Sequence, residues 1–285
     1  TTSDVYAADS LANAEVSGFD TIDLAIEALK QGDVDFVLGD LPTLKFYQAD
    51  SDGLSIAGSF SEEDFGIGVA PGESDLLAAI NVALGEIIDS GGYDTIFAAS
   101  FGDEIVVLTD DTDASTATAY PAEPTGALAD ALTAGNLTFG TDPYYPPFES
   151  FDTDGNVVGF DADVAAAIAA KIGAAYDDAD FGAIMHEKTW DELLAFGYDD
   201  YDATLSAMTK TAQRAENTDF TRAYYSSKQG ILASADSPTI SGVADLNGTY
   251  DVADPVVEEE DDSPSVTLVI SALTVGLIAV ARRKN

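Results

Sequence analysis

Apolar positions along this chain repeat with two periods, one typical of helices and one typical of strands. Ile22, Ala25, Ile26 and Leu29 lie three or four residues apart and predict an amphipathic helix. The apolar run 34–38 follows a Gly-Asp pair and predicts a buried strand. Because helices and strands continue to alternate, the pattern predicts an α/β sandwich with largely parallel sheets.

Further elements follow the same two patterns. A helix, a short strand and a second helix are expected within the first 36 residues. Later strands are expected at 65–70, 137–140, 201–207 and 223–233, and helices at 76–88, 128–132 and 160–172. The stretch 110–126 is rich in Thr, Asp, Ala and Pro without an apolar period, which is typical of a linker.

The C-terminal part has a charge pattern of its own. An apolar run from Val266 to Ala281 lies between five acidic residues at 258–262 and the basic residues 282–284. A helix of that length spans about 24 Å, which crosses a locally thinned bilayer. A buried core helix is the alternative, but such a helix is rarely flanked by charges of opposite sign. We therefore expect a transmembrane anchor with its basic end in the cytoplasm and the rest of the chain outside.

The charge balance is strongly acidic: 52 Asp and Glu face 11 Lys and Arg, for a net charge of -41. Such a surface is typical of halophiles, because molar salt shortens the Debye length to about 3 Å. With the cell-surface placement, we expect an archaeal halophile. The charge also disfavours nucleic-acid binding. Since the chain has no cysteine and only His186 among its histidines, we expect no disulfide, no metal site and no cofactor.

From Leu137 onward, a succession of motifs points to one family. The matching stretches are TDPYYPPFE (141–149), GFDADV (159–164), TWD (189–191), YDATLSAMT (201–209), QR (213–214) and DF (219–220). In these the chain resembles the extracellular solute-binding proteins of family 3, which are the binding subunits of polar amino-acid ABC importers. The resemblance implies a two-lobed type 2 periplasmic-binding fold with a hinge, an amino acid or similar small solute as ligand, and the importer's membrane subunits as partners.

The first hundred residues resemble the same family, but they match its later part. TTSDVY (1–6), GDVDFVLGD (32–40), FGIGVA (65–70), GYDTIF (92–97) and FG (101–102) look like the second lobe, the return hinge strand and the family's C-terminal end. The two parts are therefore complementary and in swapped order. A circularly permuted chain and a fragment of a tandem protein both explain this order, and both remain open.

This reading divides the chain into segments. Residues 1–63 are the main part of lobe two, 64–104 the return hinge and helices packing on lobe one, 105–127 a linker, 128–234 lobe one, 235–256 the outgoing hinge and the start of lobe two, 257–265 an acidic spacer and 266–281 the transmembrane anchor.

The resemblance also implies a binding site for an amino acid. Arg214 and Thr209, with the backbone of Ala207, are expected to bind the ligand's carboxylate, which suits a planar bidentate donor. Thr1 and Thr2, at a helix start, are expected to add donors from the other lobe. Asp40 is expected to bind the ammonium group, Tyr145 and Trp190 to pack against the side chain, and Asp142 to read its polar end. Composition supports Arg214, because this acidic chain has only four arginines and two of them lie beside the expected anchor.

Three alternatives stand beside this function. An enzyme needs a titratable pair in the cleft, and none can be named from the sequence, so we expect no catalysis. A solute-sensing ectodomain without transport would have the same motifs, and neighbouring genes for a permease and an ATPase would distinguish it. A non-functional fragment would bind no ligand.

Overall fold

The computed structural model describes residues 1–12, 14–104, 108, 117–236, 240, 242–246 and 278–283. Its helices are α1 (Thr2–Ser10), α2 (Ile22–Gln31), α3 (Leu41–Ala49), α4 (Ser74–Asp89), α5 (Gly92–Phe101), α6 (Gly126–Ala134), α7 (Phe160–Ala175) and α8 (Trp190–Leu194), with short 3-10 turns at Arg214–Glu216 and Val243–Leu246. Its strands are β1 (Ala14–Phe19), β2 (Phe36–Asp40), β3 (Leu54–Val69), β4 (Asn136–Thr141), β5 (Tyr144–Tyr145), β6 (Glu149–Phe151), β7 (Val157–Val158), β8 (Gly182–Glu187), β9 (Ala203–Thr204), β10 (Asp219–Ser234) and β11 (Ile278–Arg283).

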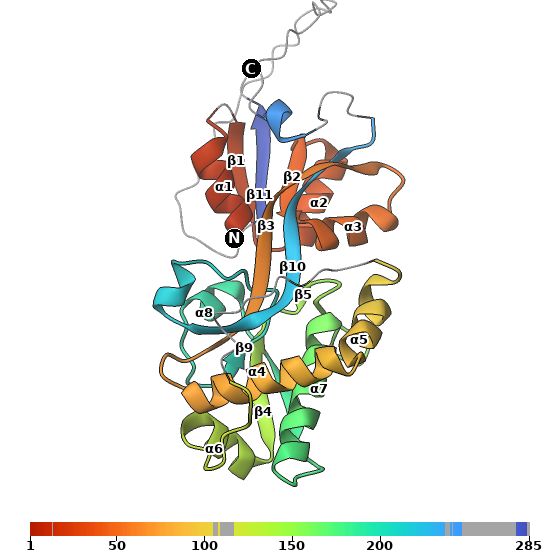
Figure 1. Cartoon of the computed structure of the whole chain (residues 1–285). Coiled ribbons are helices and arrows are strands. Elements are labelled where there is room, and N and C mark those ends of the chain that lie inside the picture. The colour runs from red at the N-terminus through yellow and green to blue at the C-terminus, as the bar shows by residue number, and fades with distance from the viewer. Residues whose placement is uncertain are drawn as a thin grey trace, which may run out of the picture.

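These elements form two lobes joined by the long strands β3 and β10 (Figure 1). The two strands pair antiparallel from Asp219 opposite Val69 to Ser234 opposite Leu54. Near the middle the register shifts, because Lys228 lies opposite Glu62 while Gln229 lies opposite Phe60. The extra residue, Ser61, has a φ of 47°, as in a β-bulge. Each of these two strands therefore contributes to both lobes, and the bulge lies between the two lobes.

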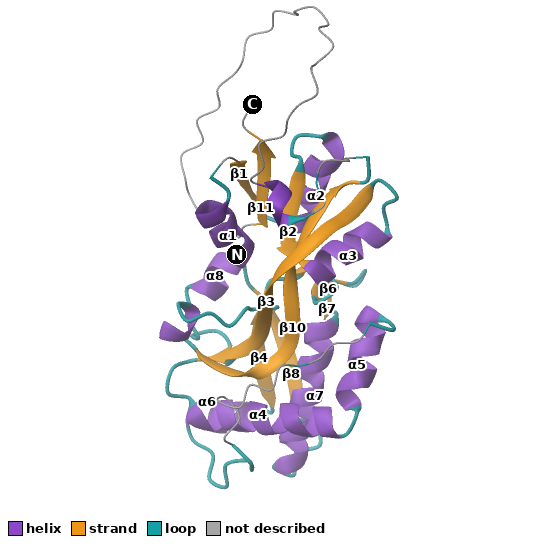
Figure 2. Ribbon diagram, turned by 45° about the horizontal axis from the view of Figure 1, so that its top comes forward, coloured by secondary structure: helices purple, strands orange, loops and turns teal. Residues whose placement is uncertain are grey.

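Lobe two is built on the strands β1, β11 and β2 with the adjoining ends of β10 and β3. Successive residues of β2 point to opposite faces, as the pleat requires. Phe36 and Leu38 pack in one apolar cluster with α1, whereas Val37 packs in another with α2 and α3. Helices thus cover both faces of the sheet in this lobe (Figure 2).

Lobe one holds the larger core. Phe65, Phe148, Phe160 and Tyr225 lie at its centre, packed against one another and against α4, α5, α6 and α7. On the opposite face α8 packs through Leu193 in a small cluster of its own. The strands β9, β4 and β8 complete this lobe's share of the sheet, and β5, β6 and β7 form a separate small sheet.

Several elements expected from the sequence are confirmed, and one feature of the sheet is wrong. The helix over Ile22–Leu29 and the strand near 34–38 correspond to α2 and β2. The expected parallel pairing is found among the described strands only for β4 with β8 and β9. The remaining named strand pairs are antiparallel, and the two hinge strands β3 and β10 are one of these pairs. The strand expected at 201–207 shrinks to β9, and Ala207 has a φ of 43°, which breaks an extended run.

The structure also bears on the expected C-terminal anchor at 266–281. Residues 266–277 lie outside the described residues, as do 109–116 of the linker, the acidic spacer 257–265 and the hinge position 237–238. Residues 278–281 are described, and there a helix is wrong, because they belong to β11, between β1 and β2. Within the described part of the chain, no helix has the length and apolar character needed to cross a membrane.

Candidate functional site

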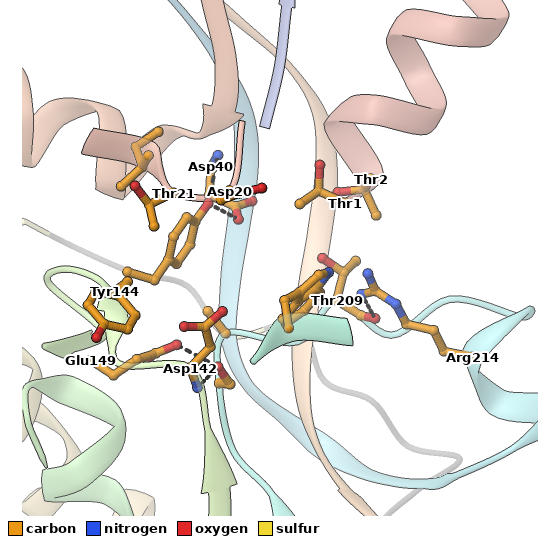
Figure 3. A pocket seen from close by; sticks show the side chains of 15 residues that line it. Thr1, Thr2, Asp20, Thr21, Asp40, Asp142, Tyr144, Glu149, Thr209 and Arg214 are labelled. Carbon is orange, nitrogen blue, oxygen red and sulfur yellow. Dashed lines mark hydrogen bonds between the residues drawn. The ribbon is translucent and has the colours of Figure 1, made fainter. Parts of the chain in front are cut away.

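One cavity lies where residues of both lobes meet (Figure 3). It encloses about 570 Å³, the space at its open mouth included. All nine residues expected at the site line it: Thr1, Thr2, Asp40, Asp142, Tyr145, Trp190, Ala207, Thr209 and Arg214. The structure therefore brings residues from distant parts of the sequence to one place, although the contacts of several differ from those expected.

Arg214 supplies the cavity's positive charge. It opens the short 3-10 turn after Thr209, and its Nη1 donates to the carbonyl oxygen of Thr209 at 2.8 Å. The centre of its guanidinium lies 5.2 Å from the centroid of the Trp190 ring, within the range of a cation–π contact. Burial lowers the pKa of Arg214, while Glu63 and Asp40 act in the opposite direction. An arginine remains charged under such conditions, so a partly buried, oriented cation faces the cavity.

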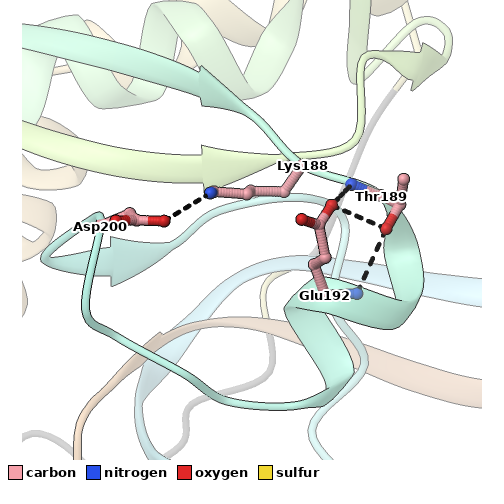
Figure 4. Close-up of polar contacts among 4 residues, drawn as sticks. All are labelled: Lys188, Thr189, Glu192 and Asp200. Carbon is pink, nitrogen blue, oxygen red and sulfur yellow. Dashed lines mark hydrogen bonds and ion pairs between the residues drawn. The ribbon is translucent and has the colours of Figure 1, made fainter.

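Trp190 is held in place by the start of α8. Thr189 caps this helix: its backbone N–H donates to Glu192 Oε2 at 2.8 Å, and the N–H of Glu192 donates back to Thr189 Oγ1 at 3.3 Å (Figure 4). Lys188, just before the cap, pairs with Asp200 at 3.0 Å (Figure 4). This capping box stabilises the first turn of α8, which begins at Trp190. One face of Trp190 thus contacts the arginine, where the sequence analysis expected it to pack against the ligand.

Asp40 ends β2 and is buried between the lobes. Its Oδ2 accepts a hydrogen bond from the Tyr145 hydroxyl at 2.7 Å, and its Oδ1 accepts one from Gln229 Nε2 at 2.7 Å. Burial, with a smaller contribution from Glu63, raises the pKa of Asp40 to about 7. Tyr145 comes from lobe one, so its hydroxyl contacts lobe two directly. It acts here as a hydrogen-bond donor, and not only as the aromatic wall expected from the sequence.

Asp142 follows β4, and its carboxyl faces the cavity from lobe one (Figure 3). Its N–H donates to Ser206 Oγ at 3.0 Å, and that hydroxyl donates to Glu149 Oε1 at 2.7 Å. Burial raises the pKa of the Asp142 carboxyl to about 6, although a hydrogen bond from the backbone of Trp190 acts against this shift. Asp142 is therefore mostly ionised at neutral pH.

Glu149, which lines the cavity, and Asp161 form a buried carboxyl pair. Glu149 Oε2 and Asp161 Oδ1 are buried, and neither accepts a hydrogen bond from an N–H or hydroxyl group. The two side chains interact directly, and burial with the charge of Asp161 raises the pKa of Glu149 well above its usual range. A proton held by Glu149 and shared with Asp161 satisfies both atoms. Asp161 also accepts the N–H of Ala207 at 2.8 Å, so this N–H is directed away from the cavity.

Two threonine hydroxyls of the cavity wall meet at Glu63. Thr2 Oγ1 and Thr209 Oγ1 both donate to Glu63 Oε2, each at 2.8 Å. Thr1 caps α1, because its Oγ1 accepts the N–H of Asp4 at 3.2 Å. The hydroxyls of Thr2 and Thr209, which were expected to bind a ligand carboxylate, therefore already donate to a carboxylate of the protein.

A comparison with known families decides what kind of protein this is. Residues 137–283, more than half of the 285-residue chain, match the family described as bacterial extracellular solute-binding proteins, family 3. This chain belongs to that family.

Relatives of this family-3 chain include proteins named for arginine. The ABC transporter arginine-binding protein 1 of Escherichia coli (strain K12) is 32% identical over 119 residues, which is 41% of this chain and 45% of the relative. The arginine-binding extracellular protein ArtP of Bacillus subtilis (strain 168) is 35% identical over 114 residues, 39% of this chain and 41% of the relative. The chain thus spans less than half the length of these relatives.

Solved structures give a match of similar extent. The P235GK mutant of ArgBP from T. maritima is 32% identical, covers 32% of this chain and 37% of that chain, and superposes with a TM-score of 0.28.

The family-3 cavity also contains residues that the sequence analysis missed: Asp20, Thr21, Ile22, Tyr144, Glu149 and Ser206. Three of them, Tyr144, Glu149 and Ser206, lie inside the motifs 141–149 and 201–209, so the motifs themselves were a usable signal. The other three lie at the start of α2, where an ordinary helix-capping pattern gives no indication of a cavity.

The charges around the cavity are unequal. Its lining contains the acidic residues Asp20, Asp40, Asp142 and Glu149 and the single basic side chain Arg214. With Glu149 protonated, carboxylates still outnumber the guanidinium once Asp40 and Asp142 are ionised. A zwitterion that carries a further positive charge balances such a lining better than a neutral or acidic one.

Proposed function

We propose that this chain binds a cationic amino acid outside the cytoplasmic membrane and delivers it to an ABC importer. The observation that carries the proposal is the joint presence of Arg214, Asp40 and Asp142 in one cavity between two lobes. Arg214 suits the ligand's carboxylate, and Asp40 suits its ammonium group. Asp142 is the partner for a positive charge at the end of the side chain. The relatives named as arginine-binding proteins support this class of ligand.

Binding between the lobes couples ligand capture to hinge motion. The hydrogen bond from Tyr145 to Asp40 already crosses from one lobe to the other. A ligand that contacts Arg214 of lobe one and Asp40 of lobe two adds further bonds across the same gap, and so favours the closed arrangement. We propose that the importer's membrane subunits recognise this closed form.

Thermal shift and calorimetry of the full chain test this function. The -41 net charge suggests molar KCl as the buffer. L-Arginine at a hundredfold over its dissociation constant should stabilise the fold by about 2.7 kcal/mol. Arg214→Ala should abolish that shift, while Arg222→Ala, an arginine outside the cavity lining, should preserve it. A cooperatively folded chain that binds no amino acid would reject the proposal.

An enzyme is the rival with a specific observation in its favour. The raised pKa values of Asp40 and Asp142 are a feature that general acids and bases share. Both groups also face a position where a bound cation would restore their ionised form, which is the expected state in a binding site. Incubating L-arginine with the folded chain and analysing it by mass spectrometry separates the two functions. Recovery of unchanged ligand supports binding, and a new product supports catalysis.

The membrane anchor at 266–281 remains a proposal for localisation. The proposal conflicts with the structure at residues 278–281, because these residues cannot lie in a bilayer and in β11 at the same time. Leu273→Lys tests it, since a lysine at the centre of a membrane helix costs about 2.5–3.5 kcal/mol on insertion. If the anchor exists, the unaltered chain sediments with membranes and the variant moves to the soluble fraction. A soluble unaltered chain would rule out the anchor.

A further inference from the structure

Two carboxyl groups hold one stretch of the cavity wall, the consecutive residues Ser206 and Ala207. Glu149 Oε1 accepts the Ser206 hydroxyl at 2.7 Å, and Asp161 Oδ2 accepts the N–H of Ala207 at 2.8 Å. Ser206 Oγ in turn accepts the N–H of Asp142 at 3.0 Å. Glu149 comes from β6, whereas Asp161 comes from α7, is fully buried and does not line the cavity. Two separate elements of lobe one therefore fix two neighbouring wall residues.

The backbone of Ala207 needs such support. Its φ of 43° lies in the left-handed region, which a residue with a Cβ atom rarely adopts. Asp161 Oδ2 accepts the Tyr224 hydroxyl at 2.9 Å as well as the N–H of Ala207. Asp161 lies in the first turn of α7, and its own N–H donates to the carbonyl oxygen of Phe148 at 2.9 Å. A carboxyl group fixed by a helix thus holds Ala207 in an unfavourable conformation.

The remaining oxygens of the two carboxyl groups face each other. Glu149 Oε2 and Asp161 Oδ1 are buried without an N–H or hydroxyl donor, and the two side chains interact directly. Burial and the charge of Asp161 raise the pKa of Glu149 well above its usual range, whereas burial raises the pKa of Asp161 to about 6. At neutral pH Glu149 therefore keeps a proton and donates it in a hydrogen bond to Asp161.

We infer that Glu149 and Asp161 are positioning residues, which are joined by one shared proton and hold Ser206 and the left-handed Ala207 in place in the cavity wall. The same stretch of backbone continues to Thr209, whose carbonyl oxygen accepts a hydrogen bond from Arg214 at 2.8 Å. A displacement of the wall therefore also displaces the guanidinium group. This inference rests on the proposed function, because its effect is measured on the affinity for an amino acid.

Infrared spectroscopy tests the shared proton without any ligand. A protonated carboxyl group has a carbonyl absorption separate from that of a carboxylate. The unaltered chain at neutral pH should show one such absorption that disappears in Glu149→Gln. Asp163→Asn is the matched control and should keep it, because Asp163 is exposed on the same helix as Asp161. Identical absorption in the unaltered chain and Glu149→Gln would overturn the inference.

Two variants of Glu149 test the positioning role by calorimetry with L-arginine. Glu149→Met removes both the acceptor for Ser206 and the donor to Asp161, and L-arginine should bind about tenfold more weakly. Glu149→Gln keeps an acceptor oxygen and supplies an N–H in place of the shared proton, so it should recover most of that affinity. Equal losses in the two variants would show that the charge or the acidity of Glu149 matters instead, and would overturn the inference.

Tyr224→Phe covers the case in which Glu149→Met does not fold. It removes one donor to Asp161, and Tyr224 does not line the cavity. L-Arginine should bind about fivefold more weakly, as for the loss of one hydrogen bond. Adding Ala207→Gly should recover at least half of this loss in free energy, because glycine adopts the left-handed conformation readily. No recovery would show that the pair does not act through Ala207.

Failure of the inference and failure of the proposed function give different results. If the folded, unaltered chain binds L-arginine but lacks the infrared absorption that depends on Glu149, the inference is wrong and the proposed function stands. If the absorption is present but the folded chain binds no amino acid, the proposed function is wrong, and the positioning role in ligand binding is wrong with it.

Discussion

The two aspartates of the cavity, one from each lobe, are held in different ways. Asp40 of lobe two is held by side-chain hydrogen bonds to both of its oxygens, from Tyr145 and Gln229. Asp142 of lobe one is restrained by a backbone hydrogen bond from Trp190, and its carboxyl faces the cavity. A group fixed on both oxygens suits the part common to all amino acids, the ammonium. A less constrained group suits the part that varies, the side chain.

The largest effect is expected from removing the charge of Asp40, the aspartate with hydrogen bonds to both oxygens. Asp40→Asn should weaken binding of every amino acid by about 2–5 kcal/mol, because the ligand's buried ammonium loses its charged partner. Calorimetry with L-arginine and L-glutamine measures this, since the two ligands share the ammonium group but differ in side-chain charge. A loss confined to L-arginine would show that Asp40 reads the side chain instead.

A smaller effect, selective for the ligand's side chain, is expected at Asp142. Asp142→Asn should weaken the binding of L-arginine by about 1.5–3 kcal/mol, the contribution of a hydrogen bond to a charged group. L-Glutamine should bind with nearly unchanged affinity, because its side chain has no charge to pair with Asp142. Competition between the two ligands on the same sample gives the ratio directly. An unchanged ratio would contradict the role proposed for Asp142.

The pH dependence of L-arginine binding further distinguishes Asp40 from Asp142. The folded-state pKa is about 7 for Asp40 and about 6 for Asp142, both raised by burial from 3.8. A cation binds the ionised carboxylates, so affinity for L-arginine should rise with pH between about 5 and 8. Asp40→Asn should flatten the upper part of that rise and Asp142→Asn the lower part. Affinity that falls with pH would contradict both assignments.

The same shifts predict the opposite trend for the stability of the ligand-free chain. Between pH 3.8 and about 7 the folded chain binds more protons at Asp40 than the unfolded chain does. The contribution of Asp40 to the free energy of unfolding therefore decreases as pH rises through this window. Chemical denaturation at several pH values, with Asp40→Asn as the control, measures it. Other acidic groups add to the total, so the difference between the two chains is the quantity to compare.

The smallest expected effect concerns the bond between the lobes. Tyr145→Phe removes the hydroxyl that donates to Asp40 and leaves the ring in place. Binding of all amino acids should weaken by about 1 kcal/mol, since the ligand's ammonium still finds Asp40. Fluorescence titration in the same buffer detects a change of this size. A loss as large as that of Asp40→Asn would mean that Tyr145 itself contacts the ligand.

Sequence reasoning located the cavity better than it described its contacts. The family motifs of lobe one, with the stretches 1–6 and 32–40, pointed to nine ligand-binding residues, and all nine line the cavity. The contacts with Glu63, Asp161 and Gln229 were not predicted, because they depend on pairings between segments distant in the chain. The antiparallel sheet was missed for the same reason: apolar runs predict strands but do not give their direction.

The bulge at Ser61 has a mechanical consequence. A ribbon of two strands bends most easily where its ladder of hydrogen bonds is interrupted, and the register of β3 and β10 shifts at Lys228 and Gln229. For a rotation of one lobe against the other about this bulge, atoms close to the axis would move least. Glu63 lies two residues from Ser61, so such a rotation would displace it less than residues at the far rim of the cavity.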